Sequence, residues 1–451
     1  MDLRRRICLD VLPALRDAEG ELGNWRTSPL RPLLEDAVNK IQEVDIQDVA
    51  TKINDATEKM GGLQPIKELE DDLRSKILTL AGKSQDLRAK LGFTPTDPLR
   101  IFRSIRIFID EGKRGIGDAS LGSANLALLT LKLAGFEWLR LQNERSFTLV
   151  CIEEPEAHLH PHLQRSVFQK LFQENQDQPS SLFLTTHSPN IVSVTPLLSI
   201  VVLKSKTGES TKGYSLAELN LDAIEIEDLQ RYLDVTRAEI LFSKGVVFVE
   251  GDSEVALISV FANNIGFNLD EMGITVCGIG GTNFRPYVKF ATALSLPFSV
   301  ITDWDPKEGK NPLGWNRSIS LMKDIRVVKG EAPLGNTQIT QLESDEKHLR
   351  SKANEAGIFL NNDTLELEIA RTPALVQPLI EVLEDEMFGV KRQGRISAWK
   401  NDPSTINVEQ LMAMVADIGK GRLAGRIALK SVGLSPPDYI KSALEYLIKN
   451  V

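Results

Sequence analysis

The sequence predicts an α/β protein in two parts, and three observations lead to this. Two short apolar runs, residues 246–249 and 298–301, are each followed by acidic residues, as buried strands of a parallel sheet often are. From about Pro98 onward, apolar runs typical of strands alternate with helical segments. The clearest of these predicted strands is residues 147–152. Between residues 30 and 95, apolar residues instead recur at spacings of three and four, which predicts helices.

The acids that follow the two later runs are expected to meet at one edge of the sheet. Glu250 and Glu254 follow the first run, and Asp303 and Asp305 follow the second. Ligands of open α/β sheets bind where the carboxyl ends of neighbouring strands face one crevice. Four carboxylates there repel one another unless a hard divalent cation neutralises them, and Mg²⁺ prefers carboxylate oxygens. The sequence thus predicts Mg²⁺ held against a phosphodiester, and the alternative is two loops that are acidic by chance.

The order of strand, Glu-Gly-x-x-Glu, strand and Asp-x-Asp resembles the Toprim domain of topoisomerases, primases and certain nucleases. Each half of the pattern is a weak signal by itself. Both halves, in order and each on an apolar strand, favour the resemblance over chance acidic loops.

Size and composition fit a soluble globular protein of two or three domains, with 451 residues and a net charge of −9. No apolar run approaches the ~18 residues of a membrane span. The three N-terminal arginines are not followed by the long apolar region of a signal peptide. Cys8, Cys151 and Cys277 are scattered and form no metal or disulfide framework, so we expect a cytoplasmic protein.

The net charge argues against a chain that binds DNA over its whole surface, but residues 391–430 reverse the balance. Eight basic residues there face three acidic ones, a local balance of +5. Such a segment could follow a phosphate backbone, and a solvated helix surface is an equal alternative. The basic residues are Lys391, Arg392, Arg395, Lys400, Lys420, Arg422, Arg426 and Lys430.

Residues 30–95 are expected to form an inserted helical hairpin arm. The break at Gly61-Gly62 separates two helical patterns, and their apolar residues predict a seam between antiparallel helices. The seam could pack on its own domain or pair with a second subunit, and a dimer or tetramer would suit it. Its members are Val49, Ile53, Ala56, Met60, Leu69, Leu73, Ile77, Leu80, Leu87 and Leu91.

Two acidic residues, Glu153 and Glu154, follow residues 148–152 in a pattern that resembles the Walker B strand of ABC-type ATPases. Thr-Thr-His187-Ser-Pro resembles the H-loop of those enzymes, and Leu-Gly-Ser123-Ala-Asn loosely resembles their signature helix. The resemblance implies that Glu153 helps to hold Mg²⁺, Glu154 polarises water, and His187 contacts the γ-phosphate. Free N–H groups near Ser123 would face a partner's nucleotide. His187 could equally be a core histidine.

Three histidines stand at every second position: His158, His160 and His162. This spacing does not give four tetrahedral zinc ligands, and no cysteine is suitably placed beside them, so a zinc site is not expected.

The phosphate-binding loop of an ATPase is not found in the sequence. Ala81-Gly82-Lys83-Ser84 looks like the end of Gly-x-x-x-x-Gly-Lys-Ser/Thr, but Ile77 occupies the position of the first glycine. We therefore expect ATP to bind only if another chain supplies this loop. Either the chain is truncated at its N-terminus, or hydrolysis has been lost.

An ABC-type head with an inserted arm, followed directly by Toprim, resembles the OLD (overcoming lysogenisation defect) family of nucleases. Further matching segments are Ala14-Leu15-Arg16-Asp17, Trp25-Arg26-x-Ser28-Pro29-Leu30 and Arg237-Ala238-Glu239-Ile240-Leu241-Phe242. The expected domains are residues 1–235, an incomplete ATPase head with the arm at 30–95, and residues 236–451, a Toprim domain. Residues 375–451 are expected to be helical and basic.

The resemblance implies ATP-associated, metal-dependent DNA cleavage, often in phage defence and sometimes with a helicase-like partner. It assigns a later metal-binding acid to Glu366, with Glu368 as the substitute, and a phosphate-supporting lysine to Lys420. An acid in the first turn of a helix and a lysine in the last turn are the structural alternatives.

The expected mechanism uses two Mg²⁺ or Mn²⁺ ions ~4 Å apart, which bridge the scissile phosphate. Glu250 and Asp303 are the central catalytic acids, Glu254, Asp305 and Glu366 complete the metal ligands, and Lys420 neutralises charge in the transition state. Gly280-Gly281 could let the backbone approach the phosphate or could form a simple turn.

Two rival enzyme functions need features that the sequence does not show. A type IA topoisomerase needs a tyrosine in a large gate domain, and a primase needs a polymerase core. Neither is visible in the sequence. A non-catalytic DNA-binding or assembly subunit, or a fragment of an ATP-regulated nuclease, is the serious alternative.

Overall fold

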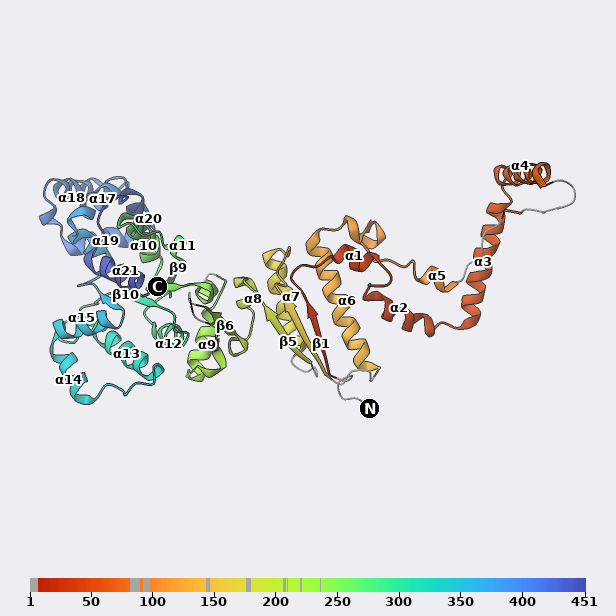
Figure 1. Cartoon of the computed structure of the whole chain (residues 1–451). Helices are drawn as coiled ribbons and strands as arrows, with labels where there is room; N and C mark the ends of the chain where they lie inside the picture. Colours follow the sequence, from red (N-terminus) through yellow and green to blue (C-terminus); the bar gives the residue numbers. More distant parts are fainter. Residues whose placement is uncertain are drawn as a thin grey trace. The chain divides into compact units, whose positions relative to one another are not determined.

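The structure is a computed structural model, and it describes residues 7–81, 90–91, 98–142, 147–175, 180–205, 208, 210–219, 221–235 and 237–451 (Figure 1). The chain divides into two compact units, Met1–Thr186 and His187–Val451. The rejected phosphate-loop candidate at 81–84 lies outside the described residues except for its first position. The seam position Leu87 and the expected end of the arm at residue 95 also lie outside them.

The first unit is built on a three-stranded parallel sheet. Its strands are β1 (Ile7–Leu12), β4 (Phe147–Glu153) and β5 (Ser180–Thr185), in the order β1-β4-β5. In β4 the side chains of Thr148, Val150 and Ile152 are buried while their neighbours are more exposed, which is the period of two expected of a strand. The helices α6 (Leu121–Leu141) and α7 (Pro161–Asn175) follow the alternating pattern that the sequence predicts.

A small core in this unit joins its first helix to α6. Ala18 and Leu22 on α1 (Ala18–Gly23) pack with Ala124 and Leu128. Asp17 caps α1, and its side chain accepts a hydrogen bond from Gly20 N at 2.8 Å. A two-stranded sheet of β2 (Phe108–Ile109) and β3 (Arg114–Gly115) precedes α6.

Three helices of the arm lie within the described residues: α2 (Leu30–Asn39), α3 (Glu43–Gly61) and α4 (Gln64–Ala81); α5 (Pro98–Phe102) lies beyond its expected end. The two long helices lie where the sequence predicts them and are separated at Gly62. The expected seam is not buried in the single chain, because Val49, Met60, Leu69 and Leu73 are between 38% and 54% exposed. An apolar seam on a helix is buried only where another element covers it. The spacing of apolar residues by three and four predicts the helix itself, but it does not predict what packs against it.

The second unit contains a four-stranded parallel sheet in the order β11-β10-β8-β9. Its strands are β8 (Gly245–Val249), β9 (Ile274–Gly278), β10 (Phe298–Thr302) and β11 (Ile358–Leu360). All five residues of β8 are buried, as expected for a central strand covered on both faces. The two apolar runs at 246–249 and 298–301 are thus confirmed as neighbouring parallel strands.

Helices cover both faces of this sheet. Val247 and Val249 pack on one face against α10 (Asp252–Asn264), α17 (Pro373–Glu384), α20 (Lys420–Lys430) and α21 (Asp438–Asn450). Val246 and Phe248 pack on the other face against α9 (Ala223–Tyr232), α12 (Arg285–Ala293) and α13 (Leu313–Val328). The remaining helices of eight or more residues are α14 (Asn336–Ser344), α15 (Glu346–Glu355), α18 (Val390–Asn401) and α19 (Val408–Ile418). The helical C-terminal part is confirmed.

Residues 187–235 belong to the second unit and share its core. Leu216 and Leu229 are fully buried in the same cluster as Ala238 and Phe248. This segment carries the antiparallel pair β6 (Val201–Lys204) and β7 (Lys212–Ser215). The compact units therefore divide at residue 187, whereas the sequence interpretation divides the domains at residue 236. Within the described residues, no helix is long and apolar enough to cross a membrane.

The loop that follows β10 is held against the start of α13 at Gly314. Gly314 N donates to Trp304 O at 3.0 Å. A Cβ at Gly314 would lie 2.6 Å from Asp303 O and 3.0 Å from Trp304 Cα. Only glycine allows this approach.

We predict that Gly314→Ala lowers the free energy of unfolding by about 2 kcal/mol, because the added methyl group forces Asp303 and the strand end apart. The control is Gly394→Ala, where a Cβ meets nothing within 4 Å in the exposed middle of α18. That change should stabilise the protein by about 0.5–1 kcal/mol. Urea unfolding of both variants measures the difference, and equal effects would contradict the close approach.

Candidate active site

The first pair of acids lies where β8 passes into α10. Glu250 directly follows the last residue of β8, and α10 begins two residues later at Asp252. Glu254 lies in the first turn of α10, is 8% exposed, and its Oε2 accepts a hydrogen bond from Gly251 N at 3.2 Å. Carboxylates are favoured at a helix N-terminus because free backbone N–H groups point toward them. The local fold thus holds Glu254 beside the strand end.

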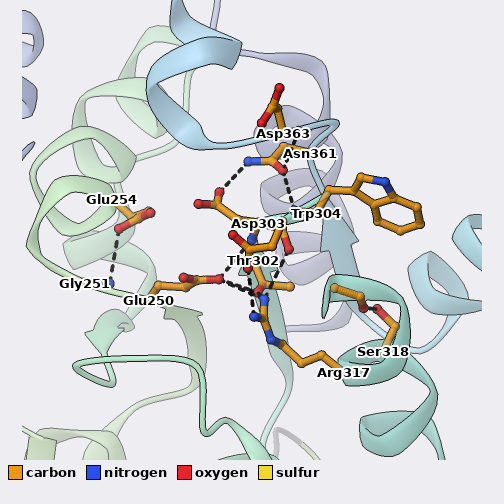
Figure 2. Close-up of polar contacts among 12 residues, drawn as sticks. Glu250, Gly251, Glu254, Thr302, Asp303, Trp304, Arg317, Ser318, Asn361 and Asp363 are labelled. Atoms are coloured by element: carbon orange, nitrogen blue, oxygen red, sulfur yellow. Dashed lines mark hydrogen bonds and ion pairs between the residues drawn. The ribbon is translucent and has the colours of Figure 1, made fainter. Parts of the chain in front are cut away.

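The second pair follows β10, the neighbouring strand. Asp303 comes directly after Thr302, and its backbone N–H donates to Glu250 Oε1 at 3.0 Å. Thr302 Oγ1 donates to the same oxygen at 2.6 Å. Asn361, which follows β11, donates through Nδ2 to Asp303 Oδ1 and accepts from Trp304 N at 2.8 Å. Figure 2 shows these side chains around one strand edge. The acids predicted from the two strand ends therefore do meet.

An arginine that the sequence analysis did not select lies between these acids. Arg317 on α13 donates through Nη1 to Glu250 Oε1 at 3.0 Å and through Nη2 to Asp305 Oδ2 at 3.0 Å (Figure 2). The side chain of Arg317 is 10% exposed. Asp305 has a φ of 51°, in the left-handed region, which turns the loop back toward α13.

Glu366 and Lys420 reach the same region from the helical part. Glu366 is 5% exposed in the first turn of α16 (Leu365–Arg371), and Lys420 Nζ lies 3.1 Å from its Oε1. Burial lowers the pKa of Lys420, but the attraction of Glu366, followed by Asp303 and Glu254, outweighs burial and raises it. Lys420 starts α20 and does not lie in its last turn, so the alternative of an ordinary C-terminal lysine is wrong. Glu368, the substitute for Glu366, instead pairs with Arg371 and Asn362.

Two of the acids, Glu254 and Asp303, form no ion pair within the described residues. Burial, followed by the charge of Glu250, raises the pKa of Asp303 to about 8. Burial also raises the pKa of Glu254 to about 7, and backbone hydrogen bonds only partly oppose it. Both groups therefore hold protons near neutral pH in the protein without metal. Clustered buried carboxylates of this kind would be stabilised by a hard cation.

The donor chemistry fits Mg²⁺ or Mn²⁺, since all five candidate ligands are carboxylates at one strand edge. As the side chains lie, however, the described residues contain no group of three or more acids, histidines or cysteines placed to hold one ion. Arg317 and Lys420 engage Glu250, Asp305 and Glu366 in ion pairs. Metal binding at these residues would therefore need side-chain rotation.

The candidate nucleotide residues Glu153, Glu154 and Ser123 lie in the first unit. Glu153 O accepts from Arg16 Nη2 at 2.8 Å, and Glu154 N donates to Thr185 O at 2.9 Å. Glu154 has a φ of 43°, an uncommon conformation that carries strain and is often found at functional sites. His187 is the first residue of the second unit, and its ring centroid lies 6.3 Å from that of Phe242.

The start of α6, where Ser123 lies, is packed tightly on the loop after Glu154. Ser123 N donates to the Ser120 hydroxyl, which caps the helix. A Cβ at Gly122 would lie 2.3 Å from His158 O, and Asn125 Nδ2 donates to Ala157 O at 3.4 Å. This contact fixes the two motifs relative to each other.

The positive charge of residues 391–430 is largely balanced by acidic side chains that lie close to it in the folded protein. Six of the eight cations of the expected phosphate-following face form ion pairs with acids, which favours the alternative of a solvated helix surface. Those acids belong mainly to α17 and the turn after it, which the sequence window did not include. The pairs are Arg392–Asp417, Lys400–Glu384, Lys420–Glu366, Arg422–Glu386, Arg426–Asp385, Arg426–Glu386, Lys430–Glu381 and Lys430–Asp385.

The glycine pair after β9 lies beside the site. Gly280 and Gly281 have φ of 74° and 151°, and Gly281 N donates to Glu250 O at 2.9 Å. The pair is therefore a turn, and it also brings the backbone close to Glu250.

Both halves of the chain match known families. Residues 241–305 match the Toprim domain of proteins like the overcoming lysogenization defect protein, and residues 17–192 match an AAA ATPase domain. The OLD nuclease of Thermus scotoductus is 25% identical over 67% of this chain and 58% of its own length. Endonuclease GajA of Bacillus cereus is 21% identical over 77% of this chain and 61% of its own length. The chain thus spans about three-fifths of these relatives.

A solved structure of the C-terminal region of the Burkholderia pseudomallei OLD protein is 33% identical. The match covers 46% of this chain and 98% of that one, with a TM-score of 0.41.

The fold and the matches define a chain that joins an AAA-type ATPase region to a Toprim domain. It belongs to the OLD family.

The raised pKa values predict how stability changes with pH. Glu254 and Asp303 ionise near pH 4 in the unfolded chain but near 7 and 8 when folded. The unfolded state therefore loses protons first, so the metal-free protein loses stability as the pH rises from about 4 to 8. The contribution of Glu254 amounts to about 3 kcal/mol over this window.

Urea unfolding of the metal-free protein at several pH values measures this loss. Glu254→Gln should flatten the pH dependence, and Glu355→Gln, an exposed acid paired with Lys352, should not. Equal slopes for wild type and Glu254→Gln would contradict the raised pKa.

Proposed function

We propose that the chain cleaves phosphodiester bonds of DNA at the carboxylate site of its Toprim domain. The observation that carries the proposal is the gathering of Glu250, Glu254, Asp303, Asp305 and Glu366 with Lys420 at one sheet edge. The names of the relatives, OLD nuclease and Endonuclease GajA, support it. Buried acids that are costly without a cation, beside a fixed lysine, suit an anionic substrate that arrives with divalent metal.

In this proposal Glu250, Glu254, Asp303, Asp305 and Glu366 would hold Mg²⁺ or Mn²⁺, which supplies an activated water and neutralises developing charge when bound. Glu250 and Asp303 are the central acids because they follow neighbouring strands and the backbone N–H of Asp303 donates to Glu250 Oε1. Asn361 orients Asp303, and Thr302 orients Glu250. These hydrogen bonds hold the two carboxylates at the strand ends in the metal-free protein.

Lys420 would neutralise charge on the phosphate in the transition state. Its ammonium group lies 3.1 Å from Glu366 Oε1 and is attracted by Asp303 and Glu254, which keeps it charged beside the acids. A cation beside the reacting phosphate stabilises the charge that develops there.

The role that we propose for the first unit is regulatory. Glu153, Glu154 and Ser123 would contact nucleotide there, and His187 would reach the γ-phosphate, if a phosphate-binding loop is supplied. A homo-oligomer, a helicase-like partner and a role in phage defence or DNA repair belong to the same proposal. Because Gly-x-x-x-x-Gly-Lys-Ser/Thr does not occur in the sequence, we expect cleavage that ATP does not drive.

A non-catalytic DNA-binding or assembly subunit is the second candidate. The observation that favours it is the engagement of Glu250, Asp305 and Glu366 with Arg317 and Lys420, which leaves no ready three-acid metal group among the described residues. The raised pKa values of Glu254 and Asp303 favour the catalytic proposal instead, since burial and then neighbouring acids disfavour their charged forms, and a metal would offset both effects.

Cleavage of supercoiled plasmid with Mg²⁺ or Mn²⁺, with and without ATP, tests the function. We predict that the wild type nicks or linearises the plasmid, and that Glu250→Ala and Asp303→Ala each lower the rate by on the order of 100-fold or more. Lys420→Ala should lower it by roughly 100-fold because its charge acts in the transition state.

The matched control is Lys352→Ala, which removes an exposed lysine paired with Glu355 outside residues 391–430 and should retain cleavage. If folded wild-type protein binds metal and leaves the plasmid intact, the assembly role replaces the nuclease.

A further inference from the structure

The most unusual feature of the site is the guanidinium between two of its acids. Arg317 Nη1 lies 3.0 Å from Glu250 Oε1 and 3.2 Å from Asp303 O, and it also donates to the Thr302 hydroxyl. Arg317 Nη2 lies 3.0 Å from Asp305 Oδ2. Two carboxylates, a hydroxyl and a backbone carbonyl are the kinds of oxygen that hard divalent cations also use.

The position of Arg317 follows from the packing of α13. Leu313 N donates to Asp305 O at 3.1 Å, and Gly314 N donates to Trp304 O at 3.0 Å, so the loop after β10 is fastened to the helix start. Helical side chains lean toward the N-terminus of their helix. A residue one turn after Gly314 therefore reaches back over this loop, which is where Figure 2 shows the guanidinium.

The acids of the site fall into two kinds. Glu250 and Asp305 share the buried guanidinium, whereas Glu254 and Asp303 have hydrogen bonds from Gly251 N and Asn361 Nδ2. No ion pair to either Glu254 or Asp303 is found in the part of the chain that the structure describes. Glu250 and Asp305 are therefore already neutralised by a resident cation, whereas Glu254 and Asp303 are not.

We propose that Arg317 occupies the Glu250–Asp305 half of the site as a resident cation and must release these carboxylates before a second divalent ion binds. This rests on the proposed function in that it takes the acids as metal ligands. The first ion then binds at Glu254 and Asp303, and Arg317 sets the affinity for the second. Arg317 is a positioning residue in this role, because it acts through the acids that it holds.

The consequence is a site that fills in two unequal steps. The buried guanidinium of Arg317 competes strongly for Glu250 and Asp305, because its planar fork donates one hydrogen bond to each carboxylate and it never loses its charge. Glutamine at this position keeps hydrogen-bonding capacity without the charge. Lysine keeps a charge but cannot span both carboxylates with one planar fork.

Titration of metal-stripped full-length chain with Mn²⁺, with free Mn²⁺ measured by electron paramagnetic resonance, tests the proposal without any turnover. The wild type should bind one ion at least about tenfold more tightly than a second. In Arg317→Gln the dissociation constant of the second ion should fall by about tenfold, and Arg317→Lys should give an intermediate decrease.

The matched control is Arg285→Gln. Arg285 also makes a two-point contact with an aspartate, at 2.7 and 3.0 Å from Asp324, and its other electrostatic neighbours are Glu225 and Asp222. This variant should keep the wild-type pattern of Mn²⁺ binding.

Several results would overturn the proposal. Two equal ions in the wild type would do so, as would a second ion that binds Arg317→Gln no more tightly than wild type. If Arg317→Gln does not fold, the wild-type titration and Arg317→Lys still decide the matter. Failure of the nuclease proposal looks different: Mn²⁺ then does not bind to the wild type at all, or it binds and plasmid remains uncut.

Discussion

Repulsion among buried carboxylates is the constraint on which the second unit depends. The carboxyl ends of β8 and β10 bring Glu250 and Asp303 into direct contact, and Glu254 and Asp305 follow within a few residues. A sheet edge of this kind would be unstable if every acid were ionised and uncompensated. The protein answers in two ways: Arg317 and Lys420 neutralise three acids, and the raised pKa values keep Glu254 and Asp303 partly protonated.

The packing around the sheet serves this arrangement. On one side, α10 lies against α20, so that Glu254 and Lys420 enter the crevice from adjacent helix starts. On the other side, the contact of Gly314 with Asp303 O sets α13 close enough for Arg317 to reach the acids. Asn361, directly after β11, donates a hydrogen bond to Asp303 from the neighbouring strand. The charged groups thus come from the first two turns of helices and from the segments that follow strand ends.

Much of this could be predicted from the sequence, because its signals are local. Short apolar runs gave the strands, and acids directly after them had to lie at the sheet edge, as Glu250 and Asp303 do. The family resemblance added Glu366 and Lys420, which the structure brings together. Arg317 had no such signal: it is a single basic residue inside a helix, and only the packing at Gly314 reveals its contacts. Asn361 follows β11 as the acids follow their strands, so the same rule could have found it.

The structure differs from the prediction where contacts between residues far apart in the sequence determine the charge or the burial of a surface. The basic balance of residues 391–430 omitted Glu381, Glu384, Asp385 and Glu386, which pair with its cations. The apolar period of the arm predicted α3 and α4 but could not show whether a second helix covers them. Local patterns therefore located helices and strand-end acids well, while surface charge and helix partners required the three-dimensional structure.

The central claim is that the carboxylates at this sheet edge form a divalent-metal site. Anomalous diffraction from crystals of the chain soaked in Mn²⁺ tests it most directly. The account predicts a manganese peak ligated by Glu254 and Asp303. Crystals of intact protein with no manganese at this edge, at concentrations that saturate known carboxylate sites, would contradict it.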